Sequence, residues 1–152
     1  MRLLAVLGLV CLVALVPAAG LSQSTQPTTG LVRIFALTQG TATTDIGSEG
    51  RSAGDRSFQG LLLTDRRGNI IGYGVVICTH LGKVLPGAVS KCTGDYTLPL
   101  GKLVASGTRQ RRDYYLLAIV GGTGVYSQAL GTLIVSTVAM SPRKERLLFS
   151  LE

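Results

Sequence analysis

Side chains with catalytic or metal-binding chemistry are few in this chain, and they are scattered along it. Its one histidine, His80, stands at the end of a predicted strand, where a histidine usually belongs to a surface loop. A metal site needs several convergent ligands, and Cys78, His80 and the distant Cys92 do not make such a set. The sequence therefore predicts no metal site and no cofactor, and it assigns no catalytic residue.

Polar side chains within otherwise apolar segments are the better candidates for ligand binding. Four tyrosines carry a phenol on such segments, an aspartate stands inside a strand where this residue type is disfavoured, and an arginine lies within the first strand. The alternative for each is structural, because such groups are more often packed at the surface or paired. The candidate ligand-binding residues are Arg33, Tyr73, Asp95, Tyr96, Tyr115 and Tyr126.

The segment 116–131, LLAIVGGTGVYSQALG, contains a glycine-rich turn between two apolar runs. A strand, a glycine turn and a helix would form a dinucleotide site, with pyrophosphate at the helix N-terminus. The third glycine of G-x-G-x-x-G, counted from Gly122, is missing, and only 28 residues follow Gly124. The next run, TLIVSTV, has the β-branched content of a strand. We therefore interpret the segment as a tight connection between two β-strands.

The body of the chain has the pattern of an all-β protein, with short apolar segments separated by turn signals and no sustained helical period. Eight antiparallel strands joined by short turns are enough to close a barrel. The predicted fold is therefore an eight-stranded antiparallel up-and-down β-barrel. Its strands are expected at residues 31–38, 58–64, 70–79, 91–98, 102–108, 114–120, 131–139 and 146–151. The longest connection, residues 39–57, is expected to cover a barrel mouth.

The first 20 residues have the features of a secretory signal peptide. Arg2 is followed by an apolar run too short to span a bilayer and by the small-residue sequence PAAG. An uncleaved anchor is the alternative. Residues 21–30 are polar and are predicted to be a flexible linker, which leaves residues 31–152 as one β-barrel domain. The predicted location is secreted or periplasmic.

Export would leave Cys78 and Cys92 as the only cysteines. In an oxidising compartment two cysteines are a candidate disulfide. Cys78 ends one predicted strand and Cys92 begins the next, so antiparallel pairing would place them opposite each other. Two free buried thiols are the alternative.

Fifteen Lys and Arg residues against eight Asp and Glu residues give the chain a net charge of +7. The basic residues cluster at 66–67, 109–112 and 143–146, between predicted strands. Solvated loop charge is the simplest interpretation. A secreted basic protein that binds an anionic polymer or surface through these loops is the alternative function. No aromatic residues alternate with these charges, and export argues against a nucleic-acid partner, so none is predicted.

The residues around the glycine turn also carry a family resemblance. A short apolar strand, GGTG, Tyr126 and Ala129-x-Gly131 resemble the allene oxide cyclase and dirigent-protein superfamily of β-barrels, and within it the bacterial allene-oxide-cyclase-like barrels. The resemblance continues upstream in CTGDYTLPLG (92–101) and ASG (105–107), and it covers roughly residues 30–151. Two departures are Leu130, where dirigent proteins commonly have Arg, and a first strand without the acidic signature of plant dirigents.

This resemblance implies a homotrimer, which agrees with strands that are apolar on both faces, such as IIGYGVVICT. It also implies confinement of a reactive hydrophobic molecule. Allene oxide cyclases shape a fatty-acid epoxide for cyclisation, and dirigent proteins direct the coupling or closure of phenol-derived intermediates. The predicted function is binding of a hydrophobic small molecule in the barrel lumen, with guidance of its cyclisation or stereoselective coupling. The residues do not decide whether the chain is an enzyme of this isomerase, cyclase or dirigent type.

Overall fold

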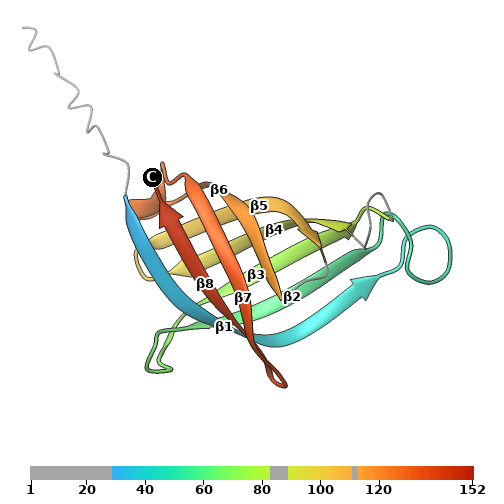
Figure 1. Ribbon diagram of the computed structural model, residues 1–152, viewed down its shortest axis with the longest axis horizontal. Helices are drawn as coiled ribbons and strands as arrows, with labels where there is room; N and C mark the ends of the chain where they lie inside the picture. The colour runs from blue at the N-terminus through green and yellow to red at the C-terminus, as the bar shows by residue number, and fades with distance from the viewer. Residues whose placement is uncertain (1–28, 83–88, 111–112) are drawn as a thin grey trace, which may run out of the picture.

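The computed structural model describes residues 29–82, 89–110 and 113–152. Within them, eight antiparallel strands form a closed barrel in which each strand pairs with its neighbours in sequence and β8 returns to β1 (Figure 1). The predicted fold is confirmed. The strands are β1 (Gly30–Thr44), β2 (Arg56–Thr64), β3 (Ile70–His80), β4 (Val89–Leu98), β5 (Gly101–Gln110), β6 (Tyr114–Gly122), β7 (Gly131–Met140) and β8 (Arg143–Leu151).

All eight predicted segments are strands, but β1 is longer than expected and continues to Thr44. A register shift between Thr38 and Gly40 lets the chain bend, after which Thr41 and Thr43 pair with β2. Threonine favours extended backbone, and a bulge of this kind keeps the alternation of faces in step with the neighbouring strand. The connection predicted at residues 39–57 is therefore only residues 45–55.

The predicted signal peptide, residues 1–20, and residues 21–28 of the predicted linker lie outside the described residues. The last residue of that linker, Gly30, begins β1. Among the residues that the structure describes, no helix is long and apolar enough to cross a bilayer.

One half of the barrel interior is filled by side chains. Tyr96 is almost fully buried and meets the Phe149 ring edge to face, with ring centroids 5.2 Å apart and planes at 77°. Such aromatic pairs contribute beyond the apolar area they bury. These residues lie toward the end of the barrel where β8 finishes, which we call the closed end. The other large, fully buried side chains of the interior are Leu63, Leu103, Leu133, Leu147 and Val135.

The glycine turn of the sequence lies at the closed end. β6 ends at Gly122, a short 3-10 helix η1 (Gly124–Tyr126) follows, and β7 begins at Gly131 and pairs antiparallel with β6. The Thr123 N–H donates to the Lys102 C=O at 2.9 Å, which ties this connection to the start of β5. The β-connection interpretation is confirmed, because an antiparallel strand follows the turn and a dinucleotide site needs a crossover helix there.

Cys78 and Cys92 face each other directly in the β3–β4 register and form a disulfide, with their Cα atoms 4.0 Å apart. The bond closes a loop of residues 78–92. We expect replacement of both cysteines by serine to lower the free energy of unfolding by about 3 kcal/mol. The reason is that the variant, which lacks the cross-link, gains more conformational entropy on unfolding than the disulfide-bonded chain does. Urea denaturation of the oxidised protein and the double variant measures this difference. Equal stabilities would show that the bond contributes nothing.

Candidate functional site

The end of the barrel opposite the closed end is open and uneven. There β1, β2, β3, β4 and β5 extend beyond β6, β7 and β8, and β1 and β2 carry residues 45–55 at their tip (Figure 1). We call this extension the lip. Its inner face is built by strand alternation, since Ser57 pairs with Cys78 across β2 and β3, and His80 pairs with Ser90 across β3 and β4.

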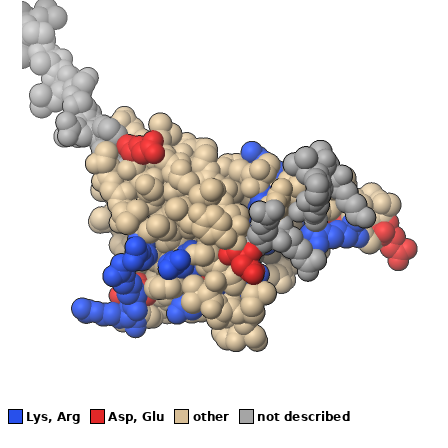
Figure 2. Space-filling model, in the orientation of Figure 1, with Lys and Arg blue, Asp and Glu red and all other residues tan. Residues whose placement is uncertain are grey.

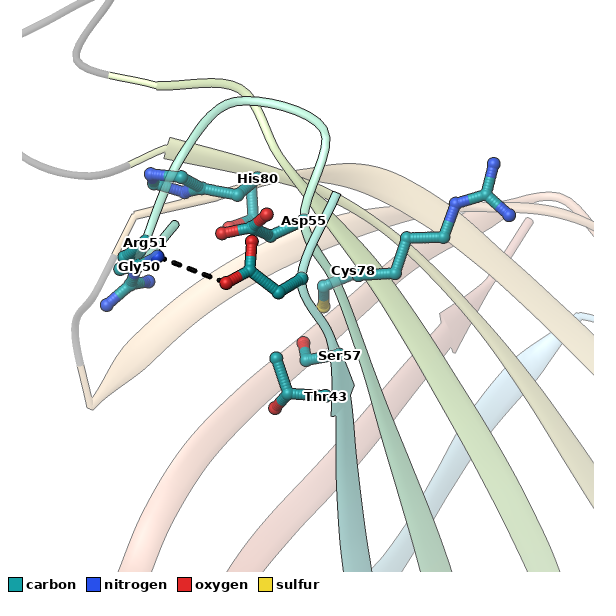
Figure 3. A pocket seen from close by; sticks show the side chains of 10 residues that line it. Thr43, Gly50, Arg51, Asp55, Ser57, Cys78 and His80 are labelled. Atoms are coloured by element: carbon teal, nitrogen blue, oxygen red, sulfur yellow. Dashed lines mark hydrogen bonds between the residues drawn. The ribbon is translucent and has the colours of Figure 1, made fainter. Parts of the chain in front are cut away.

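A cavity of about 390 Å³ lies between the inner face of the lip and residues 45–55 (Figure 3). This volume falls within the range of about 300–1,000 Å³ that is typical of small-molecule sites. The disulfide sulfur of Cys78 forms part of the wall, and polar groups surround it. The lining residues are Thr43, Asp45, Gly50, Arg51, Asp55, Arg56, Ser57, Cys78, His80 and Ser90.

Asp55 holds the loop over the cavity. Its carboxylate accepts hydrogen bonds from the Ile46 N–H at 3.0 Å and from the Ser52 N–H at 2.6 Å. These bonds lower the pKa of Asp55 below its ordinary value, the Ile46 bond most strongly. The loop is therefore fixed by an ionised side chain, and this contribution is lost only when the pH falls through that lowered pKa.

His80 lies buried in the wall of this cavity, so the expectation of a surface-loop histidine is wrong. The reason is the length of the lip, since the backbone N–H of His80 donates to the Asp55 C=O at 2.8 Å and its C=O accepts from the Gly54 N–H at 2.9 Å. These bonds continue the sheet past the end predicted for β3. The strand alternation then turns the imidazole inward (Figure 3).

The loop also contains Gly50-Arg51-Ser52-Ala53-Gly54, which matches the G-x-S-x-G pattern of a nucleophilic serine. That chemistry needs the serine on a strand-to-helix turn, with a histidine accepting its proton. Here the Ser52 Oγ donates to the Ile46 C=O at 3.1 Å and contacts the Asp55 carboxylate at 3.2 Å. Ser52 therefore orders the loop. The motif identifies a cavity-forming segment rather than a nucleophile.

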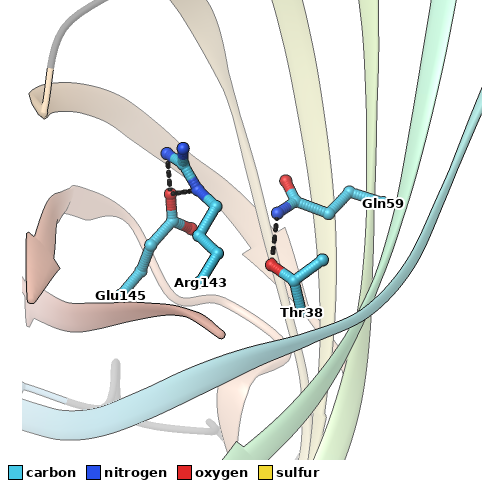
Figure 4. A network of polar contacts seen from close by, with 4 residues as sticks. All are labelled: Thr38, Gln59, Arg143 and Glu145. Atoms are coloured by element: carbon cyan, nitrogen blue, oxygen red, sulfur yellow. Dashed lines mark hydrogen bonds and ion pairs between the residues drawn. The ribbon is translucent and has the colours of Figure 1, made fainter. Parts of the chain in front are cut away.

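A polar cluster lies deeper on the inner wall of the open end (Figure 4). Glu145 is buried and accepts two hydrogen bonds from the Arg143 guanidinium, at 3.0 Å from Nε and 2.6 Å from Nη2. Gln59 Nε2 donates to Thr38 Oγ1 at 2.7 Å. Removal of Arg143 would leave a buried carboxylate without its partner, which is costly in a protein interior.

Tyr115 belongs to the same wall and lies under the guanidinium of Arg109, whose Cζ is 5.0 Å from the ring centroid. Burial raises the pKa of Tyr115 to about 12, the Glu145 charge adds to this effect, and the Arg109 charge opposes it. The phenol therefore stays protonated and remains a hydrogen-bond donor through the neutral pH range.

This raised pKa predicts a loss of stability in alkali. An unfolded tyrosine ionises near pH 10, whereas Tyr115 in the folded barrel ionises near pH 12. Its contribution is fully present below pH 10 and is lost as the pH rises through 12. We expect the difference between the phenolate absorbance titrations of wild type and Tyr115→Phe to have its midpoint near pH 12. A midpoint near 10 would show that the ring is not buried in solution.

The barrel is similar to several solved structures. No family model and no curated protein matches the sequence. Among solved structures, pyocyanin demethylase is 25% identical with a TM-score of 0.70, and the match covers 81% of this chain and 100% of that one. AbnU, an exo-specific intermolecular Diels-Alderase, is 17% identical with a TM-score of 0.66 over 82% of this chain and 98% of its own. A pterocarpan synthase dirigent protein is 14% identical with a TM-score of 0.61 over 83% and 95%.

This chain has an allene-oxide-cyclase/dirigent-like β-barrel. The resemblance read from the glycine turn and the strands after Cys92 is thus confirmed at the level of fold. In this dirigent-like barrel Gly122, Gly124 and Gly131 allow close backbone packing at the closed end, opposite the cavity.

The dirigent-like barrel separates the six residues predicted to bind a ligand. Arg33, Tyr73 and Asp95 are exposed on the outer face, because strand alternation points their neighbours inward. Tyr96 is in the filled half of the lumen, and Tyr126 is the buried last residue of η1. None of the six candidates, Tyr115 included, is among the residues that line the cavity.

Tyr115 is the candidate that lies on the inner wall of the open end. The cavity residues that sequence reasoning missed are mostly polar and come from the lip and its loop. One available signal was the run of Thr and Ser at alternate positions before and after residues 45–55, as in Thr41, Thr43 and Ser57. Alternating hydroxyl groups on paired strands mark a polar inner face.

Basic side chains are divided between different parts of the dirigent-like barrel. Figure 2 shows them gathered near the β2–β3 turn, where Arg66 and Arg67 are exposed, and separately at the tip of the lip. Arg109 and Arg143, from the other predicted clusters, contact Tyr115 and Glu145. On the face shown, the positive charge does not form one continuous surface.

Proposed function

We propose that this protein binds a hydrophobic small molecule at the open end of its barrel and guides the cyclisation or stereoselective coupling of that molecule. The observation that carries the proposal is the cavity of about 390 Å³ on the inner face of the lip. A site of this size can hold a reactive molecule in one folded conformation, which accelerates or directs an intramolecular closure.

The structural neighbours support this class of function. They include proteins described as Diels-Alderases and pterocarpan synthase dirigent proteins, all with the same barrel. Identity below a fifth of the residues shows the shared fold, and the chemistry of this chain depends on its own cavity. Here the wall combines a disulfide, hydroxyl groups and an imidazole with two aspartates and two arginines, so the bound molecule carries polar groups beside its apolar part.

A neutral apolar fluorophore, N-phenyl-1-naphthylamine, tests the site. We expect one saturable site per chain, with affinity that changes little as salt rises from about 0.05 to 0.5 M, because no charge on the probe is screened. Ser57→Phe fills the cavity from its β2 wall and should weaken binding by about tenfold or more. Thr93→Phe adds the same side chain to the exposed outer face of β4 and should leave binding unchanged. Equal binding by both variants would reject the site.

The assembly and location are part of the proposal. Tyr73, Val75 and Ile77 expose apolar side chains along the outer face of β3, where Val75 pairs with Gly60 and Ile77 with Phe58. Adjacent exposed apolar groups of this kind are typical of a covered surface. We propose that they are buried in a homotrimer of the secreted protein. Light scattering of wild type and of Val75→Lys measures the assembly, and a wild-type monomer would reject it.

A further inference from the structure

The imidazole of His80 is held in place but has a nitrogen without a partner. Both backbone groups of His80 are bonded to the loop, to Asp55 and Gly54. The residue is 8% exposed, and its Nδ1 is buried and has no hydrogen-bond partner among the described residues. Buried polar atoms are normally bonded, so an unpartnered nitrogen on a residue that lines a cavity indicates a ligand atom that completes it once the imidazole turns toward the cavity.

The charges around the cavity decide what that ligand atom is. Four charged residues line it, and the two carboxylates accept N–H groups of the loop, Asp55 from Ile46 and Ser52, and Asp45 from Gly50 at 3.0 Å. The guanidiniums of Arg51 and Arg56 have no ion-pair or hydrogen-bond partner among the described residues. Donors are therefore available in the cavity, while the carboxylates are already engaged.

The formal charges of these two aspartates and two arginines cancel. A ligand that is permanently anionic would lose its hydration and gain no net attraction, and it would meet Asp45 and Asp55 in the wall. A neutral hydroxyl group enters without that cost. If the hydroxyl is weakly acidic, an imidazole can take its proton once the group is inside.

Building on the proposed function, we propose that His80 recognises a weakly acidic hydroxyl group of the ligand, a phenol or an enol, and accepts its proton at Nδ1. The O–H bond breaks, an N–H bond forms, and the products are an imidazolium and an oxyanion. Arg51 stabilises the oxyanion from the loop side of the cavity (Figure 3). Ionisation makes the ligand oxygen and its conjugated carbons more nucleophilic, which prepares them for ring closure.

The test uses 4-nitrophenol and 4-nitroanisole, which have nearly the same shape but differ in the acidic proton. We expect the wild-type protein to bind the phenol about tenfold more tightly than the ether, because the ether cannot use His80. We also expect bound 4-nitrophenol to show a larger phenolate absorbance than the free dye at the same pH. His80→Leu should abolish both differences, so that the phenol and the ether bind with equal affinity.

Two further variants separate the parts of the proposal. His80→Asn keeps a hydrogen-bonding amide near the position of Nδ1 but cannot take a proton, so it should retain part of the preference and lose the phenolate signal. Arg51→Met should reduce the phenolate fraction while its melting temperature stays that of wild type.

Equal binding of phenol and ether by the wild type, or an unchanged phenolate signal in His80→Leu, would overturn the role of His80 and leave the proposed function standing. Failure of both dyes to bind would reject both proposals.

Discussion

Gly131→Ala is expected to lower the free energy of unfolding by about 3–5 kcal/mol, enough to unfold a marginally stable barrel. Gly131 begins β7 with φ of +135°, a conformation that disfavours any side chain. A Cβ atom there would lie 2.0 Å from the Ser150 C=O oxygen of β8. The clash involves backbone on both strands, so a side-chain rotation cannot relieve it. Urea denaturation measures the loss.

Gly121→Ala is the matched control for this substitution. Gly121 has a similar φ of +143°, but a Cβ atom there would meet no heavy atom within 4 Å. The control therefore carries the conformational strain alone, about 1–3 kcal/mol. The difference between the two variants measures the close approach of β7 to β8. Equal losses would show that strain accounts for both and that the strands have room to separate.

Phe149→Ala is expected to be comparably destabilising, by about 3–5 kcal/mol. Phe149 is fully buried and packs edge to face with Tyr96, which is itself nearly inaccessible to solvent. Removal of the ring leaves a cavity between strands that are fixed by the closed barrel, so the surrounding side chains cannot collapse into it. Thermal and urea unfolding both measure the change.

Val120→Ala is the control for the loss of apolar volume, because Val120 is 54% exposed on the outer face of β6. We expect its effect to stay within about 0.5 kcal/mol. A small effect of Phe149→Ala would contradict a packed closed end. The near-UV circular dichroism of Tyr96 offers an independent check, since the loss of its aromatic partner changes the environment of a buried tyrosine.

The substitutions of Gly131 and Phe149 both affect the closed end, whereas the proposed chemistry lies at the open end. This division follows from the barrel itself. Every strand of the closed barrel is hydrogen-bonded to a neighbour on each side. Packing around Phe149 at one end therefore holds all of the strands in place. The lip then extends from a rigid base and holds His80 and residues 45–55 over a cavity without filling it.

The sequence predicts candidate ligand-binding residues by their type, but it does not predict which face of the barrel each one occupies. A phenol in an apolar strand predicts an inward-facing Tyr115, and Tyr115 does lie on the inner wall of the open end. The same kind of pattern predicts Arg33, Tyr73 and Asp95 as ligand contacts, but these three face outward. Residue type identifies an unusual group, but the face of a strand is set by register, and one residue of shift reverses it.

The sequence by itself determined the eight strands, the antiparallel barrel, the pairing of Cys78 with Cys92 and the role of the glycine turn. These features depend on local preferences, namely β-branched runs, turn residues and cysteines at adjoining strand ends. The tertiary structure alone decided the long lip, the inward turn of His80 and the cavity. The reason is physical: the bulge after Thr38 and the bonds from residues 54 and 55 to His80 join segments far apart in the chain. These contacts form, and stabilise the lip, only when the barrel has closed.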